Sequence, residues 1–426
     1  MNKRMIAIAL SVLMCSALFG CTPKEHEEPP KATTDPGNQI RETYLNEVGT
    51  ITPLKAYPSG SKVQLLPKLS PLYVDANNVF ALKMVKALGN DWTGVFSPIS
   101  IQIALEMLSN GGDEAACSAL LNAVCPGLTR DDVNSNANKM ISYLVKASGV
   151  SFNTAVVVNN DLRLSQKFAN AAADYYSSAV GALDFSDPSA ALNEINTWVK
   201  DNTNGIIERL LSENEIGADT AVVLLNALTM DLKWEDKFYA LRELITFYGS
   251  KGEGSAPAVA SSGMFGYGEY ENGCMVTLPY QNGEFAMAVI LPDKGVSPAE
   301  AIETMMTKVG ECSVSNVVIK MPKLELDSRI DVLSMSKELG LFDALNGNFS
   351  ELVAGESPII SAVLQQNHIC VNEQGTTAVS AAAVVATKGA PVFGGDHTVV
   401  CDRPYAMLIY HVETGTVMYV SIVNDI

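Results

Sequence analysis

A long run of small, uncharged residues near the C-terminus constrains the fold of this chain more than any other feature. From Gln374 to Thr387 the sequence has no charged residue and no proline, and Glu373 and Lys388 flank the run. Exposed loops usually carry charge, proline, asparagine or aspartate, so an ordinary surface loop fits poorly. A buried alanine-rich helix is one alternative, but Gly375 and the Thr and Val residues weaken a helix and suit an extended chain. From these residues alone, helix and strand remain equally favoured.

The composition is that of a large folded protein. Hydrophobic residues make up 47% of the chain and charged residues 18%, which is ample apolar material for a core. The net charge of -18 argues against nucleic acid, because phosphate binding needs clustered Lys and Arg. We therefore expect no nucleic-acid partner.

The N-terminal residues resemble an export signal. Lys3 and Arg4 precede an apolar run that ends at Gly20 and is too short for a comfortable membrane span of about 20 residues. We predict a signal peptide over residues 1–20. The run continues into Leu18-Phe19-Gly20-Cys21, which resembles a bacterial lipobox with Cys21 as the lipidated residue. An ordinary signal peptide with a chance cysteine is the alternative.

Residues 21–70 are polar and contain scattered prolines, with no sustained periodicity. Such a segment cannot bury a core and suits a tether followed by an irregular lead-in. We expect a monomeric, exported outer-membrane lipoprotein that contacts the membrane only through its lipid anchor. It would face either the cell surface or the periplasm.

From residue 71 to 426 the pattern predicts one α+β domain. Ser97-Pro98 begins a helix that ends at Gly111-Gly112, and Ser297 begins another with a capping box. Strands alternate with helices in no regular βαβ order, which favours α+β over a doubly wound sheet. Glu413-Thr414-Gly415 indicates a hairpin. Runs rich in Val and Thr predict strands over 151–158, 220–229, 274–279, 285–291 and 314–324.

Searches for catalytic patterns give little. The chain has no H-E-x-x-H pair, no G-x-S-x-G turn and no phosphate-binding glycine loop. Two S-x-x-K matches, at Ser59 and Ser334, lack the partner motifs of penicillin-recognising enzymes. His368 and His397 fall in strand-like stretches without a convincing Asp or Ser companion, so we interpret both as structural. No two cysteines form a C-x-x-C pair. We expect no enzyme activity, no cofactor and no metal.

Several motifs, in order along the chain, resemble those of the serpin family of protease inhibitors. Residues 371–378, V-N-E-Q-G-T-T-A, closely resemble the serpin hinge V-N-E-x-G-T-x-A. The resemblance covers about residues 72 to 426. The other matching segments are Phe96-Ser97-Pro98-Ile99-Ser100-Ile101, Ile195-Asn196 to Ile206, Leu225-Asn226-Ala227, Lys233-Trp234, Leu278-Pro279-Tyr280, Leu291-Pro292-Asp293, Met321-Pro322-Lys323 and Asp402-Arg403-Pro404-Tyr405.

This resemblance implies a serpin fold, with about nine helices around three β-sheets and an exposed reactive-centre loop. It also implies suicide inhibition of serine proteases, or of cysteine proteases, in which the cleaved loop inserts as a strand into the central sheet. An inserted strand must lack proline and must fit a packed face on alternate residues. The hinge residues are then Glu373, Gly375, Thr376, Ala378, Ser380 and Ala382.

The shutter and breach of the family control the opening of that sheet. Many animal serpins have a histidine at the position of Gln365, and glutamine can still donate and accept hydrogen bonds. Trp234 resembles the tryptophan where the hinge first enters the sheet. The residues that the resemblance assigns to these regions are Ser97, Ser100, Asn226, Trp234 and Gln365.

The scissile bond lies at Lys388-Gly389 or at Gly389-Ala390. The family's usual spacing from Glu373 places the residue before the cut at Gly389, yet Lys388 is the more inviting side chain. Cleavage after Lys388 implies trypsin-like targets, and cleavage after Gly389 implies subtilisin-like or elastase-like targets. We favour Lys388. Two alternatives to inhibition are a non-inhibitory envelope binding protein and a hydrolase on the same scaffold, and the missing nucleophile motifs argue against the hydrolase.

Overall fold

The computed structural model of the protein describes residues 68–212, 215–377 and 394–426. None of the helices in these ranges is both long enough and apolar enough to cross a membrane. In chain order the helices are α2 (Pro71–Leu88), α3 (Pro98–Ser109), α4 (Glu114–Val124), α5 (Arg130–Leu144), α6 (Gln166–Tyr176), α7 (Pro188–Asn202), α8 (Pro298–Met305) and α9 (Phe342–Leu345), with a 3₁₀ turn η1 (Met306–Lys308).

Helix starts follow the capping signals in the sequence. Ser97 caps α3 by accepting a hydrogen bond from the Ser100 amide at 3.4 Å, and proline follows at the first helical position. Ser297 and Glu300 form the predicted capping box at α8. At α7 the cap is Asp187, whose side chain accepts from the amide three residues on.

A seven-stranded sheet contains the segment singled out by the sequence. Its strand order is β3-β2-β4-β14-β15-β5, with β13 paired to the other side of β14. The strands are β2 (Val150–Asn159), β3 (Ala179–Leu183), β4 (Val222–Met230), β5 (Leu232–Lys233), β13 (Leu324–Asp331), β14 (Ile360–Val371) and β15 (Gly375–Thr377).

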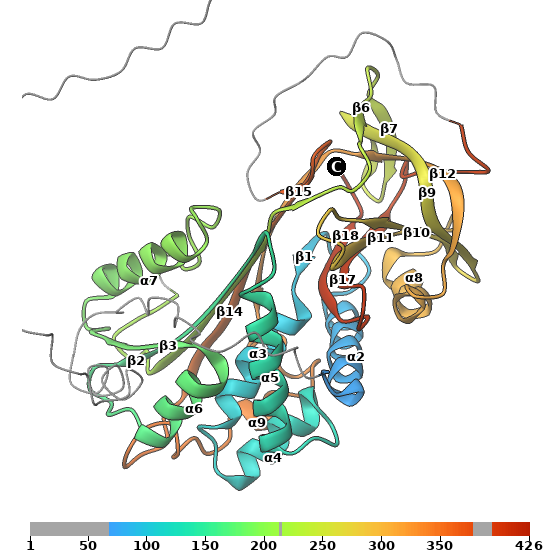
Figure 1. The fold of residues 1–426 in the computed structure, drawn as a ribbon. Coiled ribbons are helices and arrows are strands. Elements are labelled where there is room, and N and C mark those ends of the chain that lie inside the picture. The colour runs from blue at the N-terminus through green and yellow to red at the C-terminus, as the bar shows by residue number, and fades with distance from the viewer. Residues whose placement is uncertain (1–67, 213–214, 378–393) are drawn as a thin grey trace, which may run out of the picture. The chain divides into compact units, whose positions relative to one another are not determined.

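Alternation of side chains along β4 gives this sheet two covered faces. Val222 and Leu224 join the larger core cluster, which includes α3, whereas Val223 and Leu225 join a second cluster with Trp198 of α7. Figure 1 shows α7 on one face of the sheet and α3 on the other. The central strands are therefore apolar on both sides.

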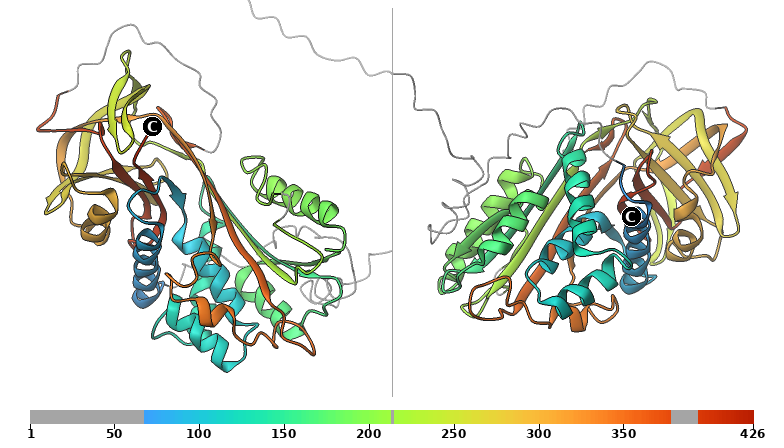
Figure 2. Two further views of the ribbon diagram at one scale, coloured as in Figure 1. Left: turned by 180° about the vertical axis from the view of Figure 1, so that it is seen from behind. Right: turned by 60° about the horizontal axis from the view of Figure 1, so that its bottom comes forward.

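A nine-stranded sheet forms the second layer, and β7 and β8 form a separate hairpin. Its order is β1-β18-β17-β11-β10-β9-β12-β16, with β6 paired to β9. In both views of Figure 2 the yellow strands of this sheet lie away from the green helix α7. The strands are β1 (Gly94–Phe96), β6 (Tyr239–Ala240), β7 (Ile245–Gly249), β8 (Gly252–Ala256), β9 (Ala258–Tyr270), β10 (Gly273–Pro279), β11 (Phe285–Pro292), β12 (Ser313–Pro322), β16 (His397–Val400), β17 (Tyr405–His411) and β18 (Val417–Val423).

The observed elements match the predicted α+β class with three sheets. About nine helices were expected, and the described ranges hold eight α-helices. The hairpin around Glu413 is confirmed by the pairing of β17 with β18. The single strand predicted over 314–324 is wrong at its end, because the chain leaves β12 at Pro322 and begins β13, in the other sheet, at Leu324.

Candidate functional site

Strands β4 and β14 share a parallel ladder along only part of their length. The shared register runs from Val222 to Asn226 on β4 and from Ile360 to Gln365 on β14. Within the described strands, residues 227–230 then pair only with β2, and residues 366–369 pair only with β13. On the edge of β14 that faces β4, pairing begins again at Cys370, where the partner is β15. The two central strands are thus joined at one end and separated by β15 at the other.

Two amide side chains stand at the last shared pair of this ladder. Asn226 and Gln365 are register partners, and both are buried. The Gln365 amide donates to the Ser97 carbonyl at 3.0 Å and accepts from the Ser97 N–H at 3.0 Å. Asn226 donates to the Ser100 carbonyl at 2.6 Å, and its oxygen bonds the Ser100 hydroxyl.

Both central strands are therefore attached to the same end of α3. The first turn of a helix has amide groups without intrahelical partners, and here Gln365 satisfies the Ser97 amide just before that turn. All these bonds join neutral groups, each with a net contribution of about 0.5–1.5 kcal/mol. They hold β4 and β14 together without a buried charge, so separation of the strands leaves no unpaired ion in the core.

A tight reversal at residues 372–375 places β15 in the sheet. The backbone N–H of Asn372 donates to the Gly375 carbonyl at 3.1 Å, and the backbone N–H of Gln374 donates to the side-chain oxygen of Asn372 at 2.8 Å. A Cβ on Gly375 would lie 1.9 Å from the Leu232 carbonyl oxygen, so any larger residue would push β15 away from β5. Glycine is required here by the close approach of two backbones.

Trp234 packs against this reversal. Its indole N–H donates to the Asn372 carbonyl at 2.9 Å, and its backbone N–H donates to Gln374 at 2.9 Å. Its ring stacks on Tyr280 with centroids 4.8 Å apart, and the Tyr280 hydroxyl bonds the hydroxyl of buried Thr376. The first side chain of β15 is thus already enclosed in the structure.

An ion pair between Glu373 and Lys323 is a charged contact of the hinge. Each side chain is about one quarter exposed, so water screens the pair, and such pairs contribute about 0–1 kcal/mol. It orients the reversal more than it stabilises the fold.

Asn367 lies in the stretch of β14 that pairs with β13 but not with β4 or β15. Its side chain is buried, and its Nδ2 has no hydrogen-bond partner in the part of the chain that the structure describes. An unsatisfied buried donor costs about 1–3 kcal/mol. The donor lies on the same face of β14 as Gln365, two residues further along the strand.

Comparison with known proteins identifies this arrangement. The family described as Serpin (serine protease inhibitor) matches residues 75–426. The chain belongs to the serpin family. This is a family of protease inhibitors rather than of enzymes.

Individual serpins support the assignment. Glia-derived nexin of Mus musculus is 30% identical over 352 residues, covering 78% of this chain and 87% of the nexin. An uncharacterized serpin-like protein of Methanosarcina acetivorans is 26% identical, covering 82% and 85%. Native Tengpin, a thermophilic serpin, superposes with a TM-score of 0.74 at 24% identity, covering 84% of this chain and 96% of Tengpin. Native protease nexin-1 with heparin gives 0.72 at 25% identity, covering 84% and 100%. The predicted serpin fold is confirmed.

Within this serpin the predicted site residues form two groups along one sheet. One group, which we call the shutter, lies at the last shared pair of the β4–β14 ladder and consists of Ser97, Ser100, Asn226 and Gln365. Glu373, Gly375, Thr376 and Trp234 meet at β15, which we call the breach. The other predicted residues lie outside the described ranges, namely Cys21, Ala378, Ser380, Ala382, Lys388, Gly389 and Ala390.

Three contacts of the seven-stranded sheet were not expected from the sequence: those of Tyr280, of Asn367, and of His368 with Asp327. Tyr280 was noted only as part of a motif, and no role was expected for Asn367. The interpretation that His368 has no acidic companion is wrong, because its Nδ1 lies 2.9 Å from an Asp327 carboxylate oxygen. These contacts join strands that are far apart in sequence, and only the strand register reveals them. His397 instead stacks on Tyr267 with ring centroids 3.9 Å apart.

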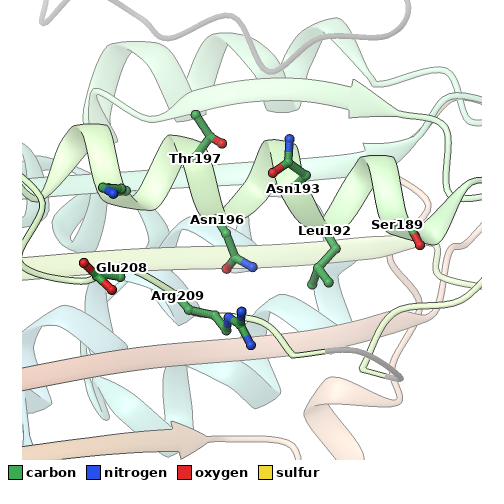
Figure 3. Close-up of a pocket in the computed structure, with 8 residues that line it drawn as sticks. Ser189, Leu192, Asn193, Asn196, Thr197, Glu208 and Arg209 are labelled. Atoms are coloured by element: carbon green, nitrogen blue, oxygen red, sulfur yellow. The ribbon is translucent and has the colours of Figure 1, made fainter.

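One pocket of this serpin bears on the alternative of a non-inhibitory binding protein that holds a small molecule. It lies beside α7, has a volume of about 360 Å³, and presents mainly polar groups (Figure 3). Small-molecule sites are mostly apolar and enclosed, so this polar pocket does not resemble a carrier cavity. Its lining consists of Ser189, Leu192, Asn193, Asn196, Thr197, Lys200, Glu208 and Arg209.

Proposed function

We propose that this serpin is a suicide inhibitor of serine proteases, with cysteine proteases as a second target class. The protease attacks the loop after β15, forms an acyl-enzyme, and is trapped when the cleaved loop inserts between β4 and β14. The observation that carries the proposal is β15 itself, which already lies between β14 and β5 with Thr376 buried. Insertion needs only to extend a strand that has begun.

The register of β15 predicts where the inserted residues go. Thr377 pairs with Cys370, and Thr376 pairs with Val371. Continued in the same antiparallel register, Ser380 would lie beside Asn367 and Ala382 beside Gln365. The Ser380 hydroxyl could then accept from the unpartnered Asn367 amide. Ala382 is small enough to pass the shutter side chains.

The energy of insertion is sufficient to distort a protease. If about a dozen residues each gain hydrogen bonds worth about 0.5–1.5 kcal/mol, the total is on the order of 10 kcal/mol. That is comparable to the whole stability of a domain, roughly 5–15 kcal/mol. The shutter bonds of Asn226 and Gln365 oppose this release until the loop is cut.

Covalent trapping is the test of this proposal. Purified protein is mixed with trypsin, subtilisin or elastase, and denaturing gels are used to detect a protease complex. The released C-terminal peptide is sequenced to locate the cut. If the bait is Lys388, then Lys388→Ala lowers the inhibition rate for trypsin far more than for elastase. Equal losses for both proteases contradict this choice of bond.

A hinge variant separates inhibition from simple cleavage. Thr376→Arg would bury a charge between β14 and β5, so we expect cleavage to continue while the covalent complex disappears. Thr398→Arg, on an exposed position of β16, is the matched control and should still form the complex. If the unmodified protein is cut without forming any complex, inhibition is wrong and the non-inhibitory binding protein becomes the better assignment.

The proposal includes attachment to an outer membrane through lipidated Cys21. Its support is the apolar run with two leading cations and the lipobox-like residues before Cys21. Incorporation of labelled fatty acid by the full chain, and its loss in Cys21→Ala, is the expected result. Equal labelling of the variant would contradict the anchor.

A further inference from the structure

Three potential metal ligands converge on the seven-stranded sheet. Glu325 and Asp327 lie two residues apart on β13, so their side chains share one face. His368 on β14 is the register partner of Asp327. One ligand atom from each side chain lies within 4.8 Å of the other two, and within the described residues no other group of His, Cys, Asp and Glu side chains meets this condition.

The geometry suits a small cation. The His368 Nδ1 and the Asp327 carboxylate oxygen are 2.9 Å apart. When an ion forms bonds of about 2.0–2.2 Å, its ligand atoms lie about 3 Å apart or slightly more, which is close to the separation of these two atoms. The His368 side chain is 9% exposed and fixed in the sheet, while the Asp327 side chain is 64% exposed and free to adjust. One ligand is thus held rigidly, and the carboxylates can close around an ion.

The negative charge of the Glu325 and Asp327 carboxylates is not balanced by neighbouring Lys or Arg side chains of the described residues. Lys323 of the same region pairs with Glu373, and Arg329 pairs with Glu215. Within the described residues, neither Glu325 nor Asp327 has a Lys or Arg partner. Two carboxylates on one strand face repel each other, and a bound divalent ion would relieve that repulsion.

We infer that Glu325, Asp327 and His368 bind a divalent first-row transition-metal ion of the zinc class. One imidazole and two carboxylates suit zinc and similar ions better than calcium, which prefers six to eight oxygens. Three protein ligands leave an open coordination position for water. We expected no metal from the sequence, because the ligands come from two strands and form no short motif.

The ion would bridge β13 and β14 beside residues 366–369, which have a ladder partner only on the β13 side. Binding to the folded state alone stabilises it by mass action. Zinc should therefore raise the melting temperature of the uncleaved protein. This consequence does not depend on protease inhibition, so the inference can fail or succeed independently of the proposed function.

Calorimetric titration of the full chain with Zn²⁺ tests the site. We expect a binding event whose affinity falls at least about tenfold in His368→Gln, because the ion loses one of three ligands. Asp327→Asn should give a similar loss, and its exposed side chain makes misfolding a poor explanation. The rise in melting temperature with Zn²⁺ should disappear in both variants.

Matched controls separate this site from other zinc ligands. His397→Gln changes a histidine without convergent carboxylates, and Asp161→Asn changes an exposed carboxylate elsewhere, so both should bind as the unmodified protein does. Co²⁺ absorption should show nitrogen and oxygen ligands without a sulfur charge-transfer band. A sulfur band, or unchanged affinity in both site variants, would overturn the inference.

Discussion

Helix α3 binds different parts of the molecule at its two ends. At its first turn, neutral groups of Ser97 and Ser100 bond to Asn226 and Gln365, which belong to strands of the seven-stranded sheet. Near its last turn, a buried carboxylate, Glu106, bonds instead to Tyr73 of α2 and to Cys125 at the end of α4. The proposed loop insertion requires the bonds at the first turn of α3 to break, whereas it leaves the Glu106 bonds intact.

The Glu106 network is the stronger of the two. Its carboxylate accepts from the Tyr73 hydroxyl at 2.9 Å, from the Gln102 amide at 2.7 Å and from the Cys125 thiol at 3.0 Å. Above about pH 7, where Glu106 is ionised, bonds to this charged group contribute about 1.5–3 kcal/mol each, roughly twice the value for neutral pairs. The weaker bonds therefore lie where the proposed insertion opens the sheet, and the stronger ones lie where the helices stay packed.

Removal of the carboxylate should give the largest effect. Glu106→Ala removes the acceptor of three buried donors, of which the Gln102 amide keeps only the Cys125 sulfur, so it should lower the free energy of unfolding by on the order of 3 kcal/mol or more. Urea unfolding followed by circular dichroism measures this loss. Glu303→Ala removes an exposed carboxylate paired with Lys86 and should change stability by less than about 1 kcal/mol. If both variants lose the same amount, the C-terminal network of α3 is not the stronger one.

The same carboxylate should make stability depend on pH. Burial raises the pKa of Glu106 from 4.5 to about 7. Between these two values the folded protein holds a proton that the unfolded chain has released. The free energy of unfolding therefore falls as pH rises through this window, by at most about 1.4 kcal/mol per pH unit, and this contribution is lost above about pH 7.

The pH effect is measured as a difference between two proteins. Urea midpoints are compared for the unmodified chain and for Glu106→Gln, which keeps the shape and cannot ionise. All other titrating groups are shared, so their contributions cancel. We expect the unmodified protein to lose stability relative to the variant as pH rises from 4.5 to 7. A constant difference across this range would show that Glu106 does not titrate there.

Sequence predicted the first-turn network of α3 far better than the Glu106 network. Ser97, Ser100 and Asn226 stand in contiguous motifs that resemble those of serpins, so each could be assigned a place before the fold was known. Glu106 has partners on α2 and at the end of α4, and no local pattern marks it. Asn367 was missed for the same reason. Its side-chain amide can be recognised as unsatisfied only when the neighbouring strands are in place and none of them offers it an acceptor.

The breach shows the same division. The Gly375 position followed from the hinge motif, but its physical reason, the approach of the Leu232 carbonyl, needs the strand pairing. The sequence also left helix and strand equally favoured for the run after Glu373. The structure resolves this for residues 375–377, which form β15, because β14 and β5 provide ladder partners that no single segment encodes.

The smallest expected change in stability, and the most specific change in behaviour, comes from the shutter. Asn226→Ala removes the bonds to Ser100 and should lower the stability of the native state by about 1–3 kcal/mol. Because the proposed insertion requires β4 and β14 to separate, the variant should convert faster to a loop-inserted monomer or to polymers. Incubation well below the melting temperature, followed by native gels and residual inhibition, measures this conversion.

A control on the same sheet isolates the role of the shutter. Asn159→Ala removes an asparagine at the end of β2, where its amide bonds the Thr220 carbonyl at 3.0 Å, far from α3 in the ladder. It should lose stability without faster conversion, and so should Glu106→Ala. If Asn159→Ala or Glu106→Ala converts as fast as Asn226→Ala, then conversion follows general destabilisation. In that case the two ends of α3 differ in strength alone. Faster conversion by Asn226→Ala alone, at equal or smaller loss of stability, would mean that the first-turn bonds specifically keep the two central strands together.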